Sequence, residues 1–147
     1  LFINSRLIGN IISINVENNE HIKGIITSIF NAFKRGDTNE IEKHLHKEAS
    51  VWDVFTPQLI VGEKELSAFH DHDQVQKESR GDLSIELEEP MIRSMKDFAV
   101  ATYYLEFDYK DPNAIHGKVR ITDVFIMEEG KWKILHHHEG IVPSNQD

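Results

Sequence analysis

The hydrophobic pattern of this chain changes character at Leu83. Before that residue, apolar side chains recur three and four residues apart, which is typical of helices that bury one face. From Leu83 onward they alternate with polar residues, and residues 98–107, 118–127 and 132–138 are predicted to form long strands. Helices followed by consecutive antiparallel strands predict an α+β fold, in which a curved sheet wraps around the helices. Such a cone-shaped arrangement encloses an apolar cavity, where we expect the functional site.

The main predicted helix begins at Asn18 or Asn19, either of which can cap it, and ends at Gly36. Asp37 and Glu40 have the spacing of a capping box, which predicts a second, short helix. The apolar stripe of the main helix consists of Ile22, Ile25, Ile26, Ile29 and Phe33.

The remaining segments complete one domain, as expected for 147 residues, and we assign residues 18–147 to it. Residues 49–55 are rich in β-forming side chains and predict a strand, and residues 62–79 predict a third helix. Residues 1–17 are rich in isoleucine with interspersed Asn and Ser, and predict an N-terminal arm or strand. The alternative is that they are the remnant of a longer leader.

Charge and composition exclude several classes of partner. The formal net charge of −9 disfavours phosphate backbones and anionic lipids, so we expect neither nucleic acid nor a membrane as partner. The chain has no cysteine, which excludes disulfides and thiolate sites, and we expect no cofactor. Composition leaves the compartment undecided. A cytoplasmic location is the simplest expectation, with a removed leader as the alternative.

The turn at Glu129-Gly130 predicts the register of the last hairpin, in which Asp123 lies opposite His136. The other pairs in that register are Met127 with Trp132, Phe125 with Ile134, and Ile121 with His138. A carboxylate opposite an imidazole on an apolar face shifts both pKa values and is a candidate for proton transfer. The alternative is a buried hydrogen bond with a purely structural role.

Asp53 is a second candidate, because it shares a predicted strand face with Val51 and Phe55. A carboxylate on an apolar face usually has a partner or a task. The alternative is that this end of the strand is solvated.

Two groups of histidines have spacings that raise the question of a metal site. His70 and His72 do not face each other on a helix, because they are two residues apart. His136 and His138 share one face of a strand, where a two-histidine site is conceivable. We prefer helix-surface and cavity histidines, and expect no metal.

The last two predicted strands carry a motif of spaced glycines, aromatic residues and histidines. Its residues are Gly117, Val119, Arg120, Thr122, Val124 and Phe125, followed by Gly130, Lys131, Trp132, Lys133, Ile134, His136 and His138. This pattern resembles the SnoaL-like branch of the NTF2-like superfamily over residues 18–142. The resemblance implies the cone-shaped fold. It does not fix an activity, because members range from isomerases, cyclases and hydrolases to kinase association domains.

Within that superfamily, the resemblance to ketosteroid isomerase implies roles for individual residues. Asp53 resembles the general base, and Asp123 resembles the neutral aspartate that donates a hydrogen bond to the substrate. Ile29 stands where that enzyme has a tyrosine donor on its first helix. The residues that could replace this donor are Tyr103, Tyr104 and His136.

These observations lead to two functional hypotheses. The first is an isomerase, cyclase or hydrolase that acts on a small apolar molecule by acid–base chemistry, with Asp53, Asp123 and His136 as catalytic residues. The residues expected to contact the substrate are Ile29, Trp52, Phe55, Tyr103, Phe125, Trp132 and His138. The second hypothesis is a non-catalytic module that binds a ligand or serves assembly.

The outer face of the predicted final hairpin suggests a homodimer. Its apolar centre consists of Val124, Ile126 and Leu135. The face also carries Thr122, and its polar fringe consists of Arg120, Lys133 and His137. An uncovered apolar patch usually marks an interface, and a twofold axis can close it. The family resemblance implies the same sheet-to-sheet dimer, and the alternative is that residues 1–16 fold back over the patch.

Overall fold

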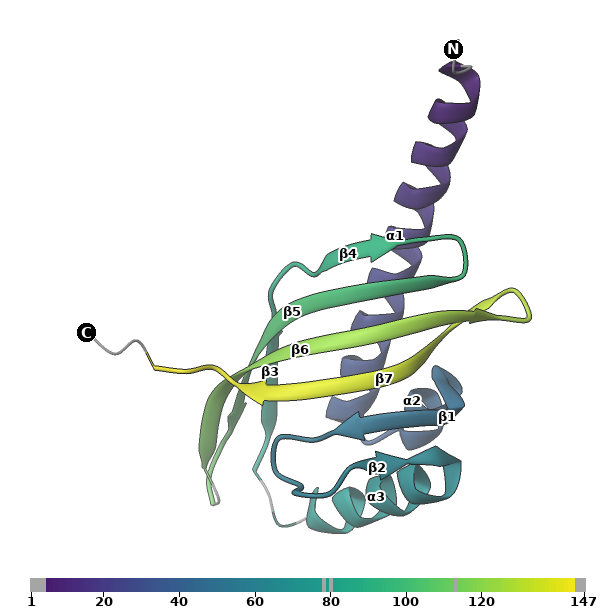
Figure 1. Ribbon diagram of the computed structural model, residues 1–147. Coiled ribbons are helices and arrows are strands. Elements are labelled where there is room, and N and C mark those ends of the chain that lie inside the picture. The colour runs from purple at the N-terminus through teal and green to yellow at the C-terminus, as the bar shows by residue number, and fades with distance from the viewer. Residues whose placement is uncertain (1–4, 78, 80, 113, 145–147) are drawn as a thin grey trace.

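The computed structural model describes residues 5–77, 79, 81–112 and 114–144. The helices are α1 (Ser5–Arg35), α2 (Thr38–Lys43) and α3 (Gly62–Lys77). The strands are β1 (Leu45–Trp52), β2 (Ile60–Val61), β3 (Leu83–Leu87), β4 (Met91–Ser94), β5 (Phe98–Tyr109), β6 (Ile115–Glu128) and β7 (Lys131–Ile141). The helices lie on one side of a curved sheet (Figure 1), which confirms the predicted α+β fold.

The described strands form one seven-stranded sheet in the order β2-β1-β7-β6-β5-β3, and β4 also pairs with β5. The long strands β5, β6 and β7 are antiparallel, as expected, whereas β1 pairs with β7 in parallel. Glu129 has a φ of 50° and Gly130 a φ of 76°. Left-handed conformations at both central residues are those of a type I′ hairpin turn, so the predicted turn is confirmed.

The core lies between α1 and the inner face of β5, β6 and β7. Ile22, Ile25 and Ile26 of α1 are buried in one cluster with Tyr103 and Phe125 of the sheet. Burying an isoleucine side chain fully stabilises a fold by about 1.5–3 kcal/mol, so the predicted stripe is the main contact that holds α1 on the sheet.

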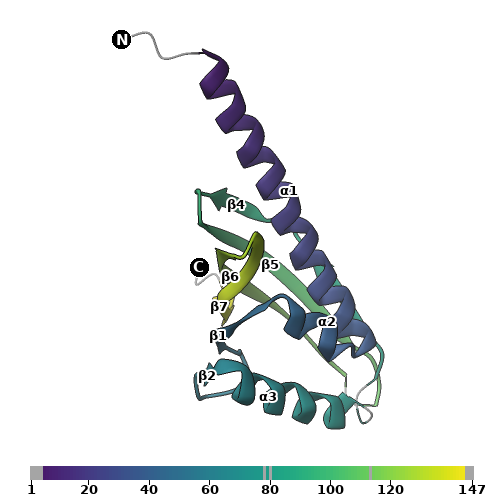
Figure 2. The ribbon, with the colours of Figure 1, turned by 90° about the vertical axis from the view of Figure 1, so that its right-hand side faces the viewer.

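The first helix begins earlier than the sequence pattern predicts. Residues 5–17 are helical and continuous with α1, so the expected strand is wrong for them, and residues 1–4 lie outside the described part. This part of α1 projects past β4 as an arm (Figures 1 and 2). Val16, within it, is 58% exposed. Isoleucine favours strands locally, but extending an existing helix avoids the cost of nucleation.

The turn between α1 and α2 follows the predicted capping pattern. Asp37 is the N-cap of α2, and its Oδ1 accepts a hydrogen bond of 3.1 Å from the backbone N of Glu40. Ile41 of this short helix is buried, as expected. The cap therefore fixes where α2 begins, and α2 connects α1 to β1.

Candidate active site

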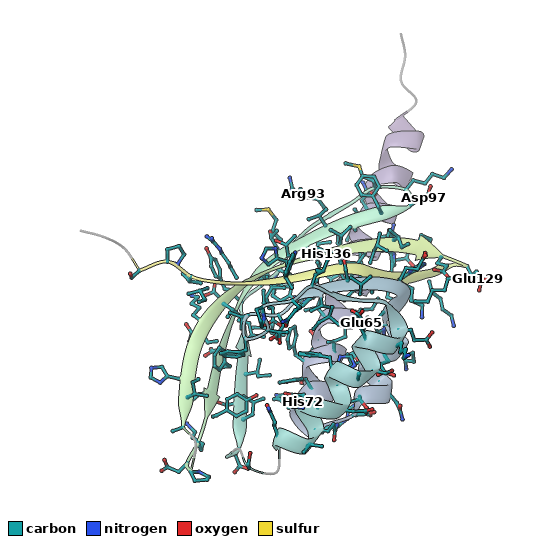
Figure 3. The ribbon with its side chains drawn as sticks, turned by 60° about the horizontal axis from the view of Figure 1, so that its bottom comes forward. Glu65, His72, Arg93, Asp97, Glu129 and His136 are labelled. Atoms are coloured by element: carbon teal, nitrogen blue, oxygen red, sulfur yellow. The ribbon has the colours of Figure 1, made fainter. Side chains whose placement is uncertain are left out.

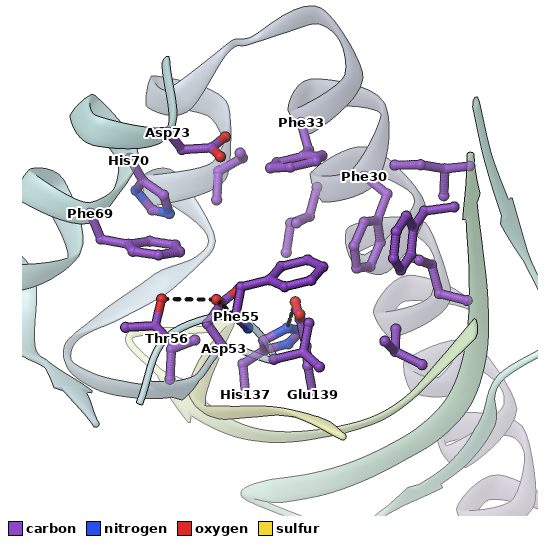
Figure 4. A pocket seen from close by; sticks show the side chains of 18 of the residues that line it. Phe30, Phe33, Asp53, Phe55, Thr56, Phe69, His70, Asp73, His137 and Glu139 are labelled. Atoms are coloured by element: carbon purple, nitrogen blue, oxygen red, sulfur yellow. Dashed lines mark hydrogen bonds and ion pairs between the residues drawn. The ribbon is translucent and has the colours of Figure 1, made fainter. Parts of the chain in front are cut away.

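A cavity of about 740 Å³ lies between the inner face of the sheet, the C-terminal half of α1, and α3 (Figure 4). Its walls are mostly apolar and aromatic, with Ile29, Phe30 and Phe33 from α1, Phe69 from α3 and Phe107 from β5. The polar side chains that line it are Asp53, Thr56, His70, His72, Asp73, Gln76, Tyr109, His137 and Glu139. The cavity thus combines an apolar volume suited to a small molecule with a few ionisable groups.

Asp53 lies directly after β1, in a turn and not in the predicted strand. Its Oδ2 accepts hydrogen bonds from the backbone N of Phe55 and from Oγ1 of Thr56, both 2.9 Å long. Its Oδ1 has no partner among the described residues. Burial raises the pKa of Asp53, the Glu139 carboxylate raises it further, and the two hydrogen bonds oppose this effect. The two hydrogen bonds to Oδ2 therefore fix the orientation of the Asp53 carboxylate, and Oδ1 is available to a ligand.

His137 lies between two carboxylates on the same side of the cavity. Its Nδ1 lies 2.5 Å from Oδ1 of Asp123, and its Nε2 lies 2.9 Å from Oε1 of Glu139. Burial favours the neutral imidazole, but Asp123 and Glu139 outweigh burial and raise the pKa of His137 well above its usual value. His137 is therefore an imidazolium that donates both of its N–H groups to carboxylates.

Asp123 is the buried centre of this network. It is 1% exposed, and its Oδ2 accepts a hydrogen bond of 2.6 Å from the Tyr103 hydroxyl. Burial and the Asp123 carboxylate raise the pKa of Tyr103 well above its usual value, so the tyrosine stays protonated and donates. Both carboxylate oxygens of Asp123 are thus occupied. Asp123 lies behind the cavity wall and holds His137 in place.

The predicted register of the last hairpin is correct near the turn and wrong beyond it. Met127 pairs with Trp132 and Phe125 with Ile134, as expected. The register then shifts, so that Asp123 pairs with His137 and not with His136. A β-bulge of this kind adds one residue to one strand and bends it. Because successive residues point to opposite faces, the shift exchanges His136 for His137 at the cavity.

His136 and His138 lie on the outer face of the sheet, contrary to the expectation. Nδ1 of His136 lies 2.7 Å from Oγ of Ser50 in β1, and its ring contacts that of His138 edge to face. Burial, followed by the neighbouring His138 and His137, lowers the pKa of His136. Figure 3 shows His136 on the sheet and His72 on α3, well apart from each other.

The other predicted contact residues are divided between the cavity, the core and the outer face. Ile29 and Phe55 line the cavity, as expected. Tyr103, Phe125 and Trp132 face inward but are buried in the core beneath α1 instead of lining the cavity. Trp52 is 39% exposed beside His138, because β1 and β7 pair in parallel and place both on the outer face.

Sequence reasoning missed His137, Glu139 and His70 as cavity residues. The run of three histidines gave the correct residue type, but no local signal marks the bulge that decides which of them faces inward. Glu139 follows His137 by two positions, so it would have been found once the register was known. The sequence predicts His70 on the surface of a helix, but its side chain is 12% exposed and lines the cavity. The described residues hold no cluster of three or more potential metal ligands.

The chain belongs to the SnoaL-like domain family, whose match spans residues 22–143. It is thus a member of the NTF2-like superfamily, as its sequence motif suggested. A search of curated proteins gives no match. None of the helices in the described part of the chain combines the length and the apolarity needed to span a bilayer.

Three solved structures illustrate the range of proteins with this fold. A candidate dehydratase of the NTF2-like family from Streptomyces avermitilis has a TM-score of 0.77 and 16% identity, covering 87% of this chain and 98% of its own. A candidate ketosteroid isomerase from Shewanella frigidimarina has a TM-score of 0.67 and 18% identity, covering 80% and 92%. The association domain of C. elegans CaMKII has a TM-score of 0.68 and 16% identity, covering 85% and 96%.

Proposed function

We propose that this protein is an enzyme that moves a proton on a small, largely apolar substrate without a cofactor. The observation that carries the proposal is the state of Asp53. This carboxylate is half-buried at an apolar cavity, burial raises its pKa, and its Oδ1 has no partner among the described residues. A general base needs a position beside the substrate and a pKa moved toward the working pH.

Each polar residue of the network has a distinct role in this proposal. Asp53 accepts a proton from the substrate and returns it to a second atom, as in an isomerisation or a cyclisation, or deprotonates a water for hydrolysis. Asp123 and Tyr103 act as positioning residues for His137. The charge of His137 lowers the pKa of Asp53 and so opposes Glu139. The catalytic role expected of His136 is therefore assigned to His137.

Replacing Asp53 with asparagine is expected to lower kcat about 100-fold or more, because the amide has no basic oxygen while its shape is preserved. The assay uses any substrate found by screening small ketones, alcohols and epoxides. Asp97→Asn, an exposed aspartate distant from the cavity, is the matched control and should keep full activity. Undiminished turnover by Asp53→Asn, with the control equally active, would contradict the assignment of Asp53 as the general base.

The alternative is a module that binds a ligand without catalysis. The uncovered face of the sheet and the likeness to an association domain support this alternative. NMR titration of the Asp53 carboxyl carbon separates the two functions. A pKa clearly above the ordinary value of about 4 supports the enzyme. An ordinary value supports the module, because a fully solvated carboxylate is a poor base for a weakly acidic substrate.

We also propose that the protein is a homodimer through the outer face of the sheet. Val124 and Ile126 lie on this face, and Leu135 is the β-bulge residue next to them in β7. His136 and His138 replace His137 in the polar fringe of the face. In the described part of the chain, helices are found only on the opposite side of the sheet (Figure 2). A twofold axis would cover the apolar centre in both copies.

The double variant Val124→Glu and Leu135→Glu is expected to be monomeric, because it places like charges across the twofold axis. Light scattering at micromolar concentration should give twice 17.0 kDa for the unmodified chain and 17.0 kDa for the variant. Val75→Glu is the matched control, because Val75 is 75% exposed on α3 and lies outside the proposed interface. A monomeric unmodified chain would contradict the proposal.

A further inference from the structure

His70 lines the cavity from α3, whereas His137 and Glu139 line it from β7 (Figure 4). Its Nδ1 lies 3.2 Å from Oε1 of Glu42 in α2, and its side chain is 12% exposed. Oγ of Ser67 donates a hydrogen bond of 3.0 Å to the same oxygen of Glu42. The ring of His70 is therefore held by a carboxylate that is itself fixed by a neighbour.

This contact leaves the other ring nitrogen of His70 for a ligand. Glu42 is an acceptor, so Nδ1 carries the proton that it shares with that carboxylate. Nε2 has no partner among the described residues. When Nδ1 carries the single ring proton, Nε2 is a hydrogen-bond acceptor, as Oδ1 of Asp53 also is.

The charges of the cavity wall favour the same kind of ligand. Asp53 and Glu139 line the cavity, and the described lining includes His137 as an imidazolium but no lysine or arginine. Carboxylates in a largely apolar enclosure repel anions more strongly than they would in water. A carboxylate or phosphate ligand is therefore disfavoured, and a neutral or cationic one is preferred.

We propose that Glu42 and His70 form a second polar subsite, and that the cavity takes a neutral or cationic molecule with an apolar body and a hydrogen-bond donor at each end. One donor, a hydroxyl or an ammonium group, binds Asp53. The other, a hydroxyl, binds Nε2 of His70. This inference rests on the proposed function, because it extends the same Asp53 site, and it names the substrate class as diols and amino alcohols.

The test uses three flexible probes of equal chain length, which are 8-amino-1-octanol, 1-octylamine and octanoate. Binding is followed at pH 7 by NMR titration of the amides of Leu105 and Ile121, which line the cavity. In the unmodified protein, 8-amino-1-octanol is expected to bind roughly threefold to tenfold more tightly than 1-octylamine, the gain from one net hydrogen bond. Octanoate is expected to bind most weakly.

His70→Phe and His70→Leu should each reduce that ratio to about one or below, because the terminal hydroxyl then has no partner in an apolar wall. His21→Phe, at an exposed histidine of α1, is the matched control and should keep the ratio. Asp53→Asn should weaken both amines alike and also keep the ratio. Amide spectra of each variant confirm that it is folded.

An unchanged ratio in both folded His70 variants would overturn the proposed subsite. So would the failure of both amines to bind, or tighter binding of octanoate than of 1-octylamine. The catalytic role of Asp53 is judged by turnover and by the titration of Asp53, and neither measurement involves His70. Active Asp53→Asn would therefore overturn the proposed function and leave the result for His70 unaffected.

Discussion

Replacing Asp123 with alanine is expected to lower the free energy of unfolding by about 3–5 kcal/mol, the cost of breaking a buried ion pair on one side. Asp123 is 1% exposed and holds both Nδ1 of His137 and the hydroxyl of Tyr103. Its removal leaves an imidazolium and a hydroxyl without these partners in the interior. Urea unfolding at pH 7 measures the loss.

Two further variants separate the charge from the hydrogen bonds. Tyr103→Phe removes one hydrogen bond to Asp123 and should cost about 1 kcal/mol. The double variant Asp123→Ala and His137→Leu removes both members of the pair, so it should recover part of the loss, because the imidazolium that had lost Asp123 is removed as well. If Asp123→Ala lowers the free energy of unfolding no more than Tyr103→Phe does, the Asp123–His137 pair does not stabilise the fold as proposed.

The protein is expected to lose stability as pH rises above about 6.5, the ordinary pKa of histidine. The pKa of His137 is raised well above that value in the folded protein, so the folded state binds a proton that the unfolded state has lost. The stabilisation by this group is complete below the unfolded pKa and is lost as pH rises through the folded pKa. Between the two values, the free energy of unfolding should fall by about 1.4 kcal/mol for each pH unit.

Urea unfolding between pH 6 and pH 9.5 tests this dependence in the unmodified protein and in His137→Gln. The glutamine variant has no proton to lose in this range, so its profile should be flatter. His21→Gln, at an exposed histidine, should follow the unmodified protein. Parallel profiles for His137→Gln and the unmodified protein would contradict the assignment of the imidazolium to His137.

Elements whose causes lie within a few residues could be predicted from the sequence. The stripe of Ile22, Ile25 and Ile26 predicted the buried face of α1, because helix periodicity alone decides which residues share a face. Asp37 and Glu40 predicted the start of α2, and Glu129-Gly130 predicted the turn between β6 and β7. In each case the interaction that fixes the structure is local, so no distant segment can change it.

Prediction of the site failed where long-range packing decides the outcome. The register shift after Ile134 and Phe125 adjoins the parallel pairing of β7 with β1, a contact between segments more than eighty residues apart. A shift of one residue reverses every side chain beyond it, so His137 faces the cavity and His136 does not. Trp52 lies on the outer face because it follows the buried Val51 in β1 and pairs with His138 of β7.

The sequence by itself determined the helix periodicity, the hairpin turn and the inward position of Asp123, because each follows from spacing along one segment. Only the tertiary structure decided which histidine joins Asp123, that Glu139 lies near Asp53, and that His70 lines the same cavity from α3. These relations join β1, β6, β7 and α3. The relative positions of separate elements depend on how they pack together, and no pattern within any one of them contains that information.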